Sequence, residues 1–193
     1  MKKIMEIRLH GRGGQGAVTA AELIAVAAFY DGKYSQAFPN FGVERRGAPV
    51  MAYCRISETP IRLREQIYSP EYVIIQDSSL IAQDHQINVG IEKCLGILIN
   101  SENPSALRRG SGLRVTLKNE NVLAVPATKI ALEKIGKPFI NTALVGAFSA
   151  MTDLISLASL ERAIKERFEG KIGEANVAAM RAAYEYARKS TKH

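Results

Sequence analysis

The stretch EIRLHGRGGQGAVTAAELIAVAAFY, residues 6–30, decides the fold of the N-terminal part of this chain. Its first five residues alternate between charged and apolar side chains, which predicts a strand over residues 6–10. Gly11, Gly13 and Gly16 follow with the spacing G-x-G-x-x-G, and residues 17–30 are apolar on nearly every side, which predicts a buried helix. A strand, a glycine turn and a helix in this order predict a Rossmann-like start whose free amides face an anion.

A dinucleotide site needs a second feature, an acidic residue at the end of the next strand that binds the ribose. The residues at that place are Gln36, Ala37 and Phe38, and Asp31 lies in the turn before the strand. The anion-binding half of the fingerprint is therefore present and the ribose-binding half is missing. A free-standing dinucleotide site and a tight turn without any ligand both stay open as alternatives.

Strand and helix patterns continue along the whole chain. The short apolar runs YVIIQ and LGILIN are typical of parallel strands that are covered on both faces. We therefore predict a single domain over residues 1–193, an α/β/α sandwich of three layers with a mostly parallel, possibly mixed sheet and a helical C-terminal third. Asn141 or Thr142 is placed to cap the third-last helix. The further strands are expected at 33–38, 49–56, 72–76, 95–100, 113–117 and 121–125, and the helices at 127–135, 141–152, 159–168 and 174–189.

Composition narrows the classes of partner. The chain has 193 residues, with 26 Lys and Arg against 19 Asp and Glu, a formal net charge of +7. This excess suits a phosphate-bearing ligand or an acidic partner. The basic residues are dispersed and no nucleic-acid motif accompanies them, so we expect no nucleic-acid partner. No segment has the pattern of a signal peptide or a membrane span, and we expect a cytoplasmic protein.

Redox and catalytic motifs are scarce. Cys54 and Cys94 stand forty positions apart, too few and too distant for a four-cysteine iron–sulfur site, and we expect two buried, reduced thiols. His10, at the end of the first strand, is expected to be a structural histidine. No catalytic triad, phosphate-binding P-loop or metal motif is visible, so we predict no catalytic residue and no metal site. The chain has the pattern of one part of an enzyme.

A second unusual stretch is FPNFGVERRGAPV, residues 38–50, a loop with two phenylalanines and an arginine pair between glycines. Arginine and aromatic side chains are enriched at protein interfaces, and the arginine fork suits phosphate. Glu44 is placed to act as a base or to pair with Arg45. The loop is therefore interpreted as an interface or ligand contact, with packing on its own domain as the alternative.

Together, RLHGRGGQGAVTAAELIA and FPNFGVERRGAPV resemble the gamma subunit of 2-oxoacid:ferredoxin oxidoreductases, in particular that of pyruvate:ferredoxin oxidoreductase (pyruvate synthase). The runs VIIQDSSLI, VPATKIA and NTALVGAF extend the resemblance over residues 4–190. It implies an enzyme that converts pyruvate, coenzyme A (CoA) and oxidised ferredoxin to acetyl-CoA, CO2 and reduced ferredoxin. Gamma-type subunits of enzymes for 2-oxoisovalerate, 2-oxoglutarate or indolepyruvate remain the alternative.

The resemblance also implies which subunits of the enzyme hold the cofactors and which contact CoA. Thiamine diphosphate and the 4Fe–4S clusters belong to the alpha, beta and delta partner subunits, and ferredoxin is reached through the complex. This chain carries no cofactor of its own, helps to enclose CoA, and is expected to be inactive in isolation, where it can self-associate. As a hypothesis, the residues that contact CoA are Gly11, Arg12, Gly13, Gly14, Gln15, Gly16, Glu44, Arg45 and Arg46.

Overall fold

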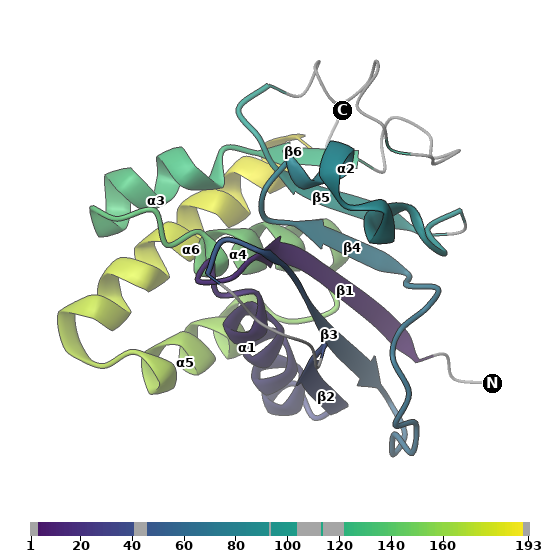
Figure 1. The fold of residues 1–193 in the computed structure, drawn as a ribbon. Helices are drawn as coiled ribbons and strands as arrows, with labels where there is room; N and C mark the ends of the chain where they lie inside the picture. Colours follow the sequence, from purple (N-terminus) through teal and green to yellow (C-terminus); the bar gives the residue numbers. More distant parts are fainter. Residues whose placement is uncertain (1–3, 41–45, 93, 104–112, 114–121, 191–193) are drawn as a thin grey trace.

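The computed structural model describes residues 4–40, 46–92, 94–103, 113 and 122–190 (Figure 1). Within these residues one six-stranded sheet has the order β2-β3-β1-β4-β5-β6. Neighbours β1, β4, β5 and β6 pair in parallel, whereas β3 is antiparallel to both β1 and β2. The strands are β1 (Met5–Arg12), β2 (Tyr34–Pro39), β3 (Pro49–Ser57), β4 (Tyr72–Ile75), β5 (Gly96–Asn100) and β6 (Val122–Val125).

The helices lie on both faces of the sheet but in unequal amounts. Five of them gather on one face, and α2 with the 3-10 helix η1 lies on the other (Figure 1). The predicted mostly parallel, mixed α/β sheet between helices is thus confirmed, with one thin outer layer. The helices are α1 (Ala17–Tyr30), α2 (Leu80–Gln83), η1 (His85–Asn88), α3 (Ala127–Ile135), α4 (Asn141–Thr152), α5 (Leu157–Arg167) and α6 (Gly170–Ser190).

The alternation in β1 sorts its side chains between the two faces. Ile7 and Leu9 enter the large core beneath α1 and α4, and both are wholly buried. Arg8 and His10 point to the opposite face, where the Arg8 guanidinium donates to the carbonyl oxygens of Ile87 (3.1 Å) and Val89 (2.7 Å). A buried cation is tolerated there because backbone carbonyls replace the water that it loses.

Helices α3 and α4 have the expected bounds, whereas α5 and α6 begin earlier than expected, at Leu157 and Gly170. Helix α5 begins at Leu157 because the Ser156 hydroxyl accepts from the Ser159 amide (3.2 Å), a capping contact. The expected cap of α4 is wrong: Ile140 occupies the cap position without a side-chain bond, and Asn141 is the first helical residue. The strand expected at 113–117 falls largely outside the described residues.

Asp31 joins the end of α1 to the start of α5. Its carboxylate accepts hydrogen bonds from the Ser156 amide, the Ser156 hydroxyl and the Ser159 hydroxyl, each at 2.6 Å. Burial alone would raise the pKa of Asp31, but the hydrogen bonds from Ser156 and Ser159 outweigh it and hold this pKa below its usual value. The carboxylate form therefore stabilises the folded chain.

Asp31→Ala should lower the free energy of unfolding by about 2 kcal/mol, because three donors lose a charged acceptor. A depressed pKa contributes stability above the usual carboxyl range, and the contribution is lost as pH falls through the lowered value. Urea unfolding of the full chain should thus show a difference at neutral pH that shrinks in acid. Glu133→Ala, which removes an exposed carboxylate from α3, should change stability by less than about 0.5 kcal/mol. Equal effects of the two variants would contradict the role of Asp31.

Candidate functional site

A cleft of about 500 Å³ opens at the carboxyl ends of the parallel strands. The chain leaves β1 toward α1 on one face of the sheet and leaves β4 toward α2 on the other. Ligands of open α/β sheets bind at such a switch point, because two adjacent loops part there. The lining residues are Gly13, Gly14, Gln15, Arg46, Gln76, Asp77, Ser78, Asn100, Thr128, Pro138, Phe139 and Ile140.

The glycine turn, residues 11–16, forms one wall of this cleft. Gly14 and Gly16 adopt positive φ angles of 94° and 77°, which favour glycine. Gly11 allows close packing, since a Cβ atom there would lie 2.3 Å from the Gln76 side-chain oxygen and would displace that side chain. Gly14 and Gly16 thus permit the sharp turn, and Gly11 permits close packing against Gln76.

Several amides of the glycine turn are already bonded within the chain. The Gly13 amide donates to the Ala48 carbonyl (2.9 Å), and the Gln15 amide donates to the Arg12 carbonyl (2.9 Å). The Gln15 side chain accepts from the Arg12 amide (2.8 Å). Among the described residues, the amides of Gly14, Gly16 and the first turn of α1 have no protein acceptor, and α1 has no side-chain cap. The anion-binding capacity is therefore confined to the helix side of the turn.

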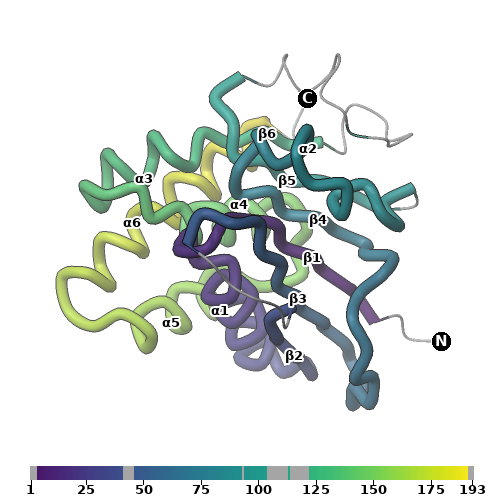
Figure 2. The backbone as a smooth tube through the Cα atoms, viewed as in Figure 1, coloured from purple at the N-terminus to yellow at the C-terminus, as the bar shows by residue number. Residues whose placement is uncertain are grey.

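The two unusual stretches of the sequence meet in the structure. Gly13 forms a parallel bridge with Arg46, and the Gly47 amide donates to the Gly13 carbonyl (3.1 Å). Figure 2 shows this return of the chain beside the turn that follows β1. Arg46 is exposed, lines the cleft and has no ion pair with another described residue. The predicted site residues Glu44 and Arg45 lie outside the described residues.

The Arg12 guanidinium is held by hydrogen bonds within the chain and is not free to turn toward the cleft. Its guanidinium donates to Asp77, Gly47, Ser79 and Gln83, so four of its five N–H groups have protein acceptors. In this arrangement Arg12 connects the wall formed by the glycine turn to the wall formed by the turn after β4. Its expected role as a contact for CoA is therefore a prediction that rests on one remaining N–H group.

Two more helices begin at the same cleft. The Asn100 side chain accepts from the Thr128 amide at the start of α3 (3.2 Å) and donates to the Thr128 hydroxyl (2.9 Å). The first residue of α4, Asn141, lies against the glycine turn. Its side-chain amide nitrogen, Nδ2, would be 2.9 Å from a Cβ atom added at Gly16. Three helix N-termini therefore converge, and their partial positive charges add up.

Sequence reasoning missed the residues that the other strands bring to the cleft. Gln76, Asn100 and Thr128 each end or follow a predicted parallel strand, and this position in the sequence could have identified them as residues of the cleft. Gln76 is wholly buried, and both ends of its side-chain amide lack a hydrogen-bond partner among the described residues. An unpartnered buried amide costs free energy, so this floor of the cleft has unused hydrogen-bonding capacity.

The strand order does not match the one that a dinucleotide-binding fingerprint requires. In a Rossmann fold the second strand lies beside the first, which brings its acid to the glycine turn. Here β3 lies between β1 and β2, so Gln36 and Phe38 pair with β3 at the sheet edge. The place of the ribose-binding acid is therefore removed from the glycine turn.

His10, Cys54 and Cys94 are buried, as expected. His10 is wholly buried, its Nε2 atom accepts from the Arg8 guanidinium (3.0 Å), and burial lowers its pKa despite the nearby Asp84 carboxylate. Burial raises the pKa of both thiols, that of Cys94 to about 11. None of the three groups lines the cleft.

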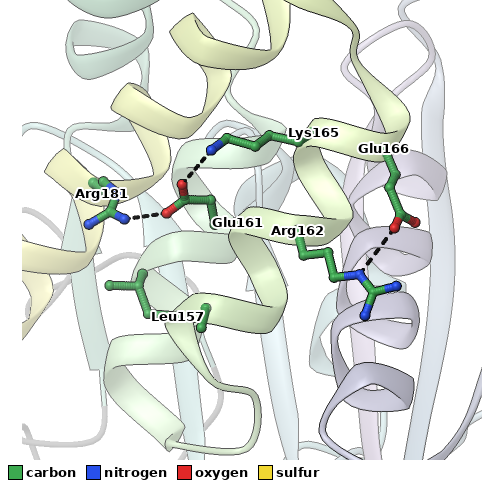
Figure 3. Close-up of a pocket in the computed structure, with 7 residues that line it drawn as sticks. Leu157, Glu161, Arg162, Lys165, Glu166 and Arg181 are labelled. Atoms are coloured by element: carbon green, nitrogen blue, oxygen red, sulfur yellow. Dashed lines mark hydrogen bonds and ion pairs between the residues drawn. The ribbon is translucent and has the colours of Figure 1, made fainter.

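A second cavity, of about 640 Å³, lies beside α5 and α6. Its charged groups are paired with one another: Glu161 accepts from Lys165 (2.8 Å) and from Arg181, and Arg162 donates to Glu166 (3.2 Å) (Figure 3). Pairs of this kind leave little charge for a ligand. In the described part of the chain, no three acidic, histidine or cysteine residues are grouped to hold a metal, and no helix is long and apolar enough to cross a membrane.

Comparisons with known proteins match this architecture. Residues 6–186 fit the family described as pyruvate ferredoxin/flavodoxin oxidoreductase. Pyruvate synthase subunit PorC of Methanothermobacter marburgensis is 50% identical over 94% of this chain and 97% of its own length. The pyruvate/ketoisovalerate oxidoreductases common subunit gamma of Pyrococcus abyssi is 47% identical over 94% and 96%.

Solved structures agree with the sequence relatives. The crystal structure of pyruvate oxidoreductase subunit PORC from Thermotoga maritima has a TM-score of 0.80 and 35% identity, and covers 95% of this chain and 97% of its own. The 2-oxoglutarate:ferredoxin oxidoreductase of Magnetococcus marinus shares the fold, with a TM-score of 0.68 and 19% identity over 100% of this chain and 32% of that one. The chain therefore belongs to the pyruvate ferredoxin/flavodoxin oxidoreductase family, where it is a gamma (PorC) type subunit of the enzyme, as its two motif stretches predicted.

Proposed function

We propose that this chain is the gamma subunit of a cytoplasmic pyruvate:ferredoxin oxidoreductase and that its cleft helps to enclose CoA. In that enzyme pyruvate, CoA and oxidised ferredoxin give acetyl-CoA, CO2 and reduced ferredoxin. The observation that carries the proposal is the convergence of three helix N-termini and Arg46 on one cleft of about 500 Å³. Together they form a site for an anion.

CoA fits the chemistry of this cleft. Its pyrophosphate and 3′-phosphate match the uncapped amides at the start of α1 and the Arg46 guanidinium, as charge-assisted hydrogen bonds require. The solved relative from Magnetococcus marinus has CoA and succinyl-CoA bound, which supports this ligand class. Gly14, Gly16 and Arg46 are the residues that we assign to the anion, with Gln15 beside them.

The chemical step belongs elsewhere in the proposed complex. Thiamine diphosphate and the 4Fe–4S clusters are assigned to the alpha, beta and delta subunits, where the first supplies decarboxylation chemistry and the others carry electrons to ferredoxin. This chain orients one substrate and excludes water around it. Because substrate choice then depends on other chains, a subunit shared with a 2-oxoisovalerate enzyme, as in the Pyrococcus abyssi relative, is the alternative.

A purely architectural role is favoured by one observation, the internal bonding of the Gly13 and Gln15 amides. Hydrogen exchange of the assembled complex separates the two roles. With CoA added, amides of Gly14, Gly16 and the first turn of α1 should exchange more slowly, whereas the α5–α6 cavity should not change. Unchanged exchange at the glycine turn, with CoA shown to be bound elsewhere in the complex, would leave the chain an architectural subunit only.

A further inference from the structure

We infer that Arg12 is a positioning residue that sets the width of the cleft, and that it does not act as a ligand of the bound anion. This inference rests on the proposed function in one respect, the use of CoA as the reporter. The geometry that carries it lies entirely within this chain.

The first argument is the number and quality of the contacts that Arg12 makes. Its Nε atom donates to Asp77 Oδ2 (2.7 Å), and one terminal nitrogen donates to the Gly47 carbonyl (3.1 Å). The other terminal nitrogen donates to Ser79 Oγ (2.9 Å) and Gln83 Oε1 (2.7 Å). A rigid guanidinium fork held at four points cannot turn toward a ligand without losing several of these bonds.

The second argument is where the four acceptors lie. Gly47 belongs to the segment that pairs with the glycine turn, Asp77 and Ser79 form the turn after β4, and Gln83 ends α2. The glycine turn leads from β1 to α1 on one face of the sheet, and the turn after β4 leads to α2 on the other face. Gly13, Gly14 and Asp77 line the cleft from these two turns. One side chain thus fixes the distance between the walls.

The third argument is the state of Asp77, the central acceptor. Its second oxygen accepts from the Ser79 amide (3.0 Å) and hydroxyl (2.6 Å), which orders the turn after β4. Burial would raise the pKa of Asp77, but the contacts with Ser79 and Arg12 lower it on balance. Asp77 is thus a carboxylate that neutralises Arg12, and Arg46 supplies the positive charge that faces a ligand.

A double-mutant cycle in the assembled holoenzyme tests the inference. Arg12→Ala and Asp77→Ala should each raise the KM for CoA about tenfold, and the double variant should be no worse than either, because one connection is broken in all three. Arg12→Lys should behave like Arg12→Ala, since charge without the fork does not restore the geometry. Normal KM in Asp77→Ala alone, or rescue by lysine, would show Arg12 to be a ligand.

A second readout does not depend on CoA. Without ligand, hydrogen exchange at residues 13–16 should accelerate to the same extent in Arg12→Ala, Asp77→Ala and the double variant. If this coupling is found while no variant changes the KM for CoA, the positioning role stands and the CoA site fails. If exchange is unchanged in every variant, the positioning role is wrong. Gln83→Ala, which removes a single contact, should shift both readouts in the same direction by less and covers the case in which Arg12→Ala does not fold.

Discussion

Valine in place of Gly146 should destabilise the chain by at least about 3 kcal/mol, a large share of the 5–15 kcal/mol that holds a typical domain folded. Gly146 lies in the middle of α4, where a Cβ atom would meet the Met180 carbonyl oxygen of α6 at 2.2 Å and its carbonyl carbon at 2.9 Å. Both contacts are with backbone, which cannot rotate away. The two helices must separate, and the buried side chains between them lose their packing.

Denaturant unfolding of the full chain measures this loss, with the yield of folded protein as a second observation. Gly136→Ala is the matched control, because its Cβ meets nothing within 4 Å and only the positive φ angle of 76° is unfavourable. That control should cost about 1–2 kcal/mol. A Gly146→Val chain as stable as the control would mean that α4 and α6 do not pack as closely as described.

Glutamate in place of Arg46 should raise the KM for CoA roughly 100-fold in the assembled enzyme, while the KM for pyruvate stays the same. Loss of a charge-assisted hydrogen bond costs about 1.5–3 kcal/mol, and each 1.4 kcal/mol is a factor of ten in affinity. Arg46 is exposed at the cleft beside Gly13 and Gly14, where a carboxylate would repel a phosphate. The predicted effect is therefore confined to the anionic substrate.

Steady-state kinetics of the two complexes measures the change. Lys171→Glu is the control, since it makes the same change of charge at an exposed position in the first turn of α6. It should leave both KM values unaltered. An Arg46→Glu enzyme with a normal KM for CoA but poor assembly would assign this arginine to a subunit interface.

Local patterns were sufficient to predict much of the fold. Helix α1 and strands β4 and β5 were expected from runs whose periodicity reflects burial, and they lie where the runs lie. The inserted antiparallel strand β3 was foreseen only as a strand, because its direction depends on a connection and a pairing that no local pattern encodes. The cap of α4 failed because Asn141 is already inside the helix, beside the glycine turn.

The candidate site was predictable in part for the same reason. The glycine turn and Arg46 were found from their own sequence neighbourhoods, and the structure brings them together. Gln76 and Asn100 lie at the ends of two strands and Thr128 lies at the start of α3, so no single stretch of sequence predicts that they meet. Polar residues directly after parallel strands were visible in the sequence, but only the strand order decides which of them share an edge.

The sequence by itself determined the strand–turn–helix start, the absence of a cysteine-based cluster and the membership of a gamma-type family, since these depend on residue types and short spacings. The tertiary structure alone decided what Arg12 does. Its main partner, Asp77, is 65 positions away, and the two meet only because β1 and β4 are neighbours in the sheet. The partner of a charged side chain such as Arg12 therefore depends on which strands pair, and the spacing of residues along the chain does not predict that pairing.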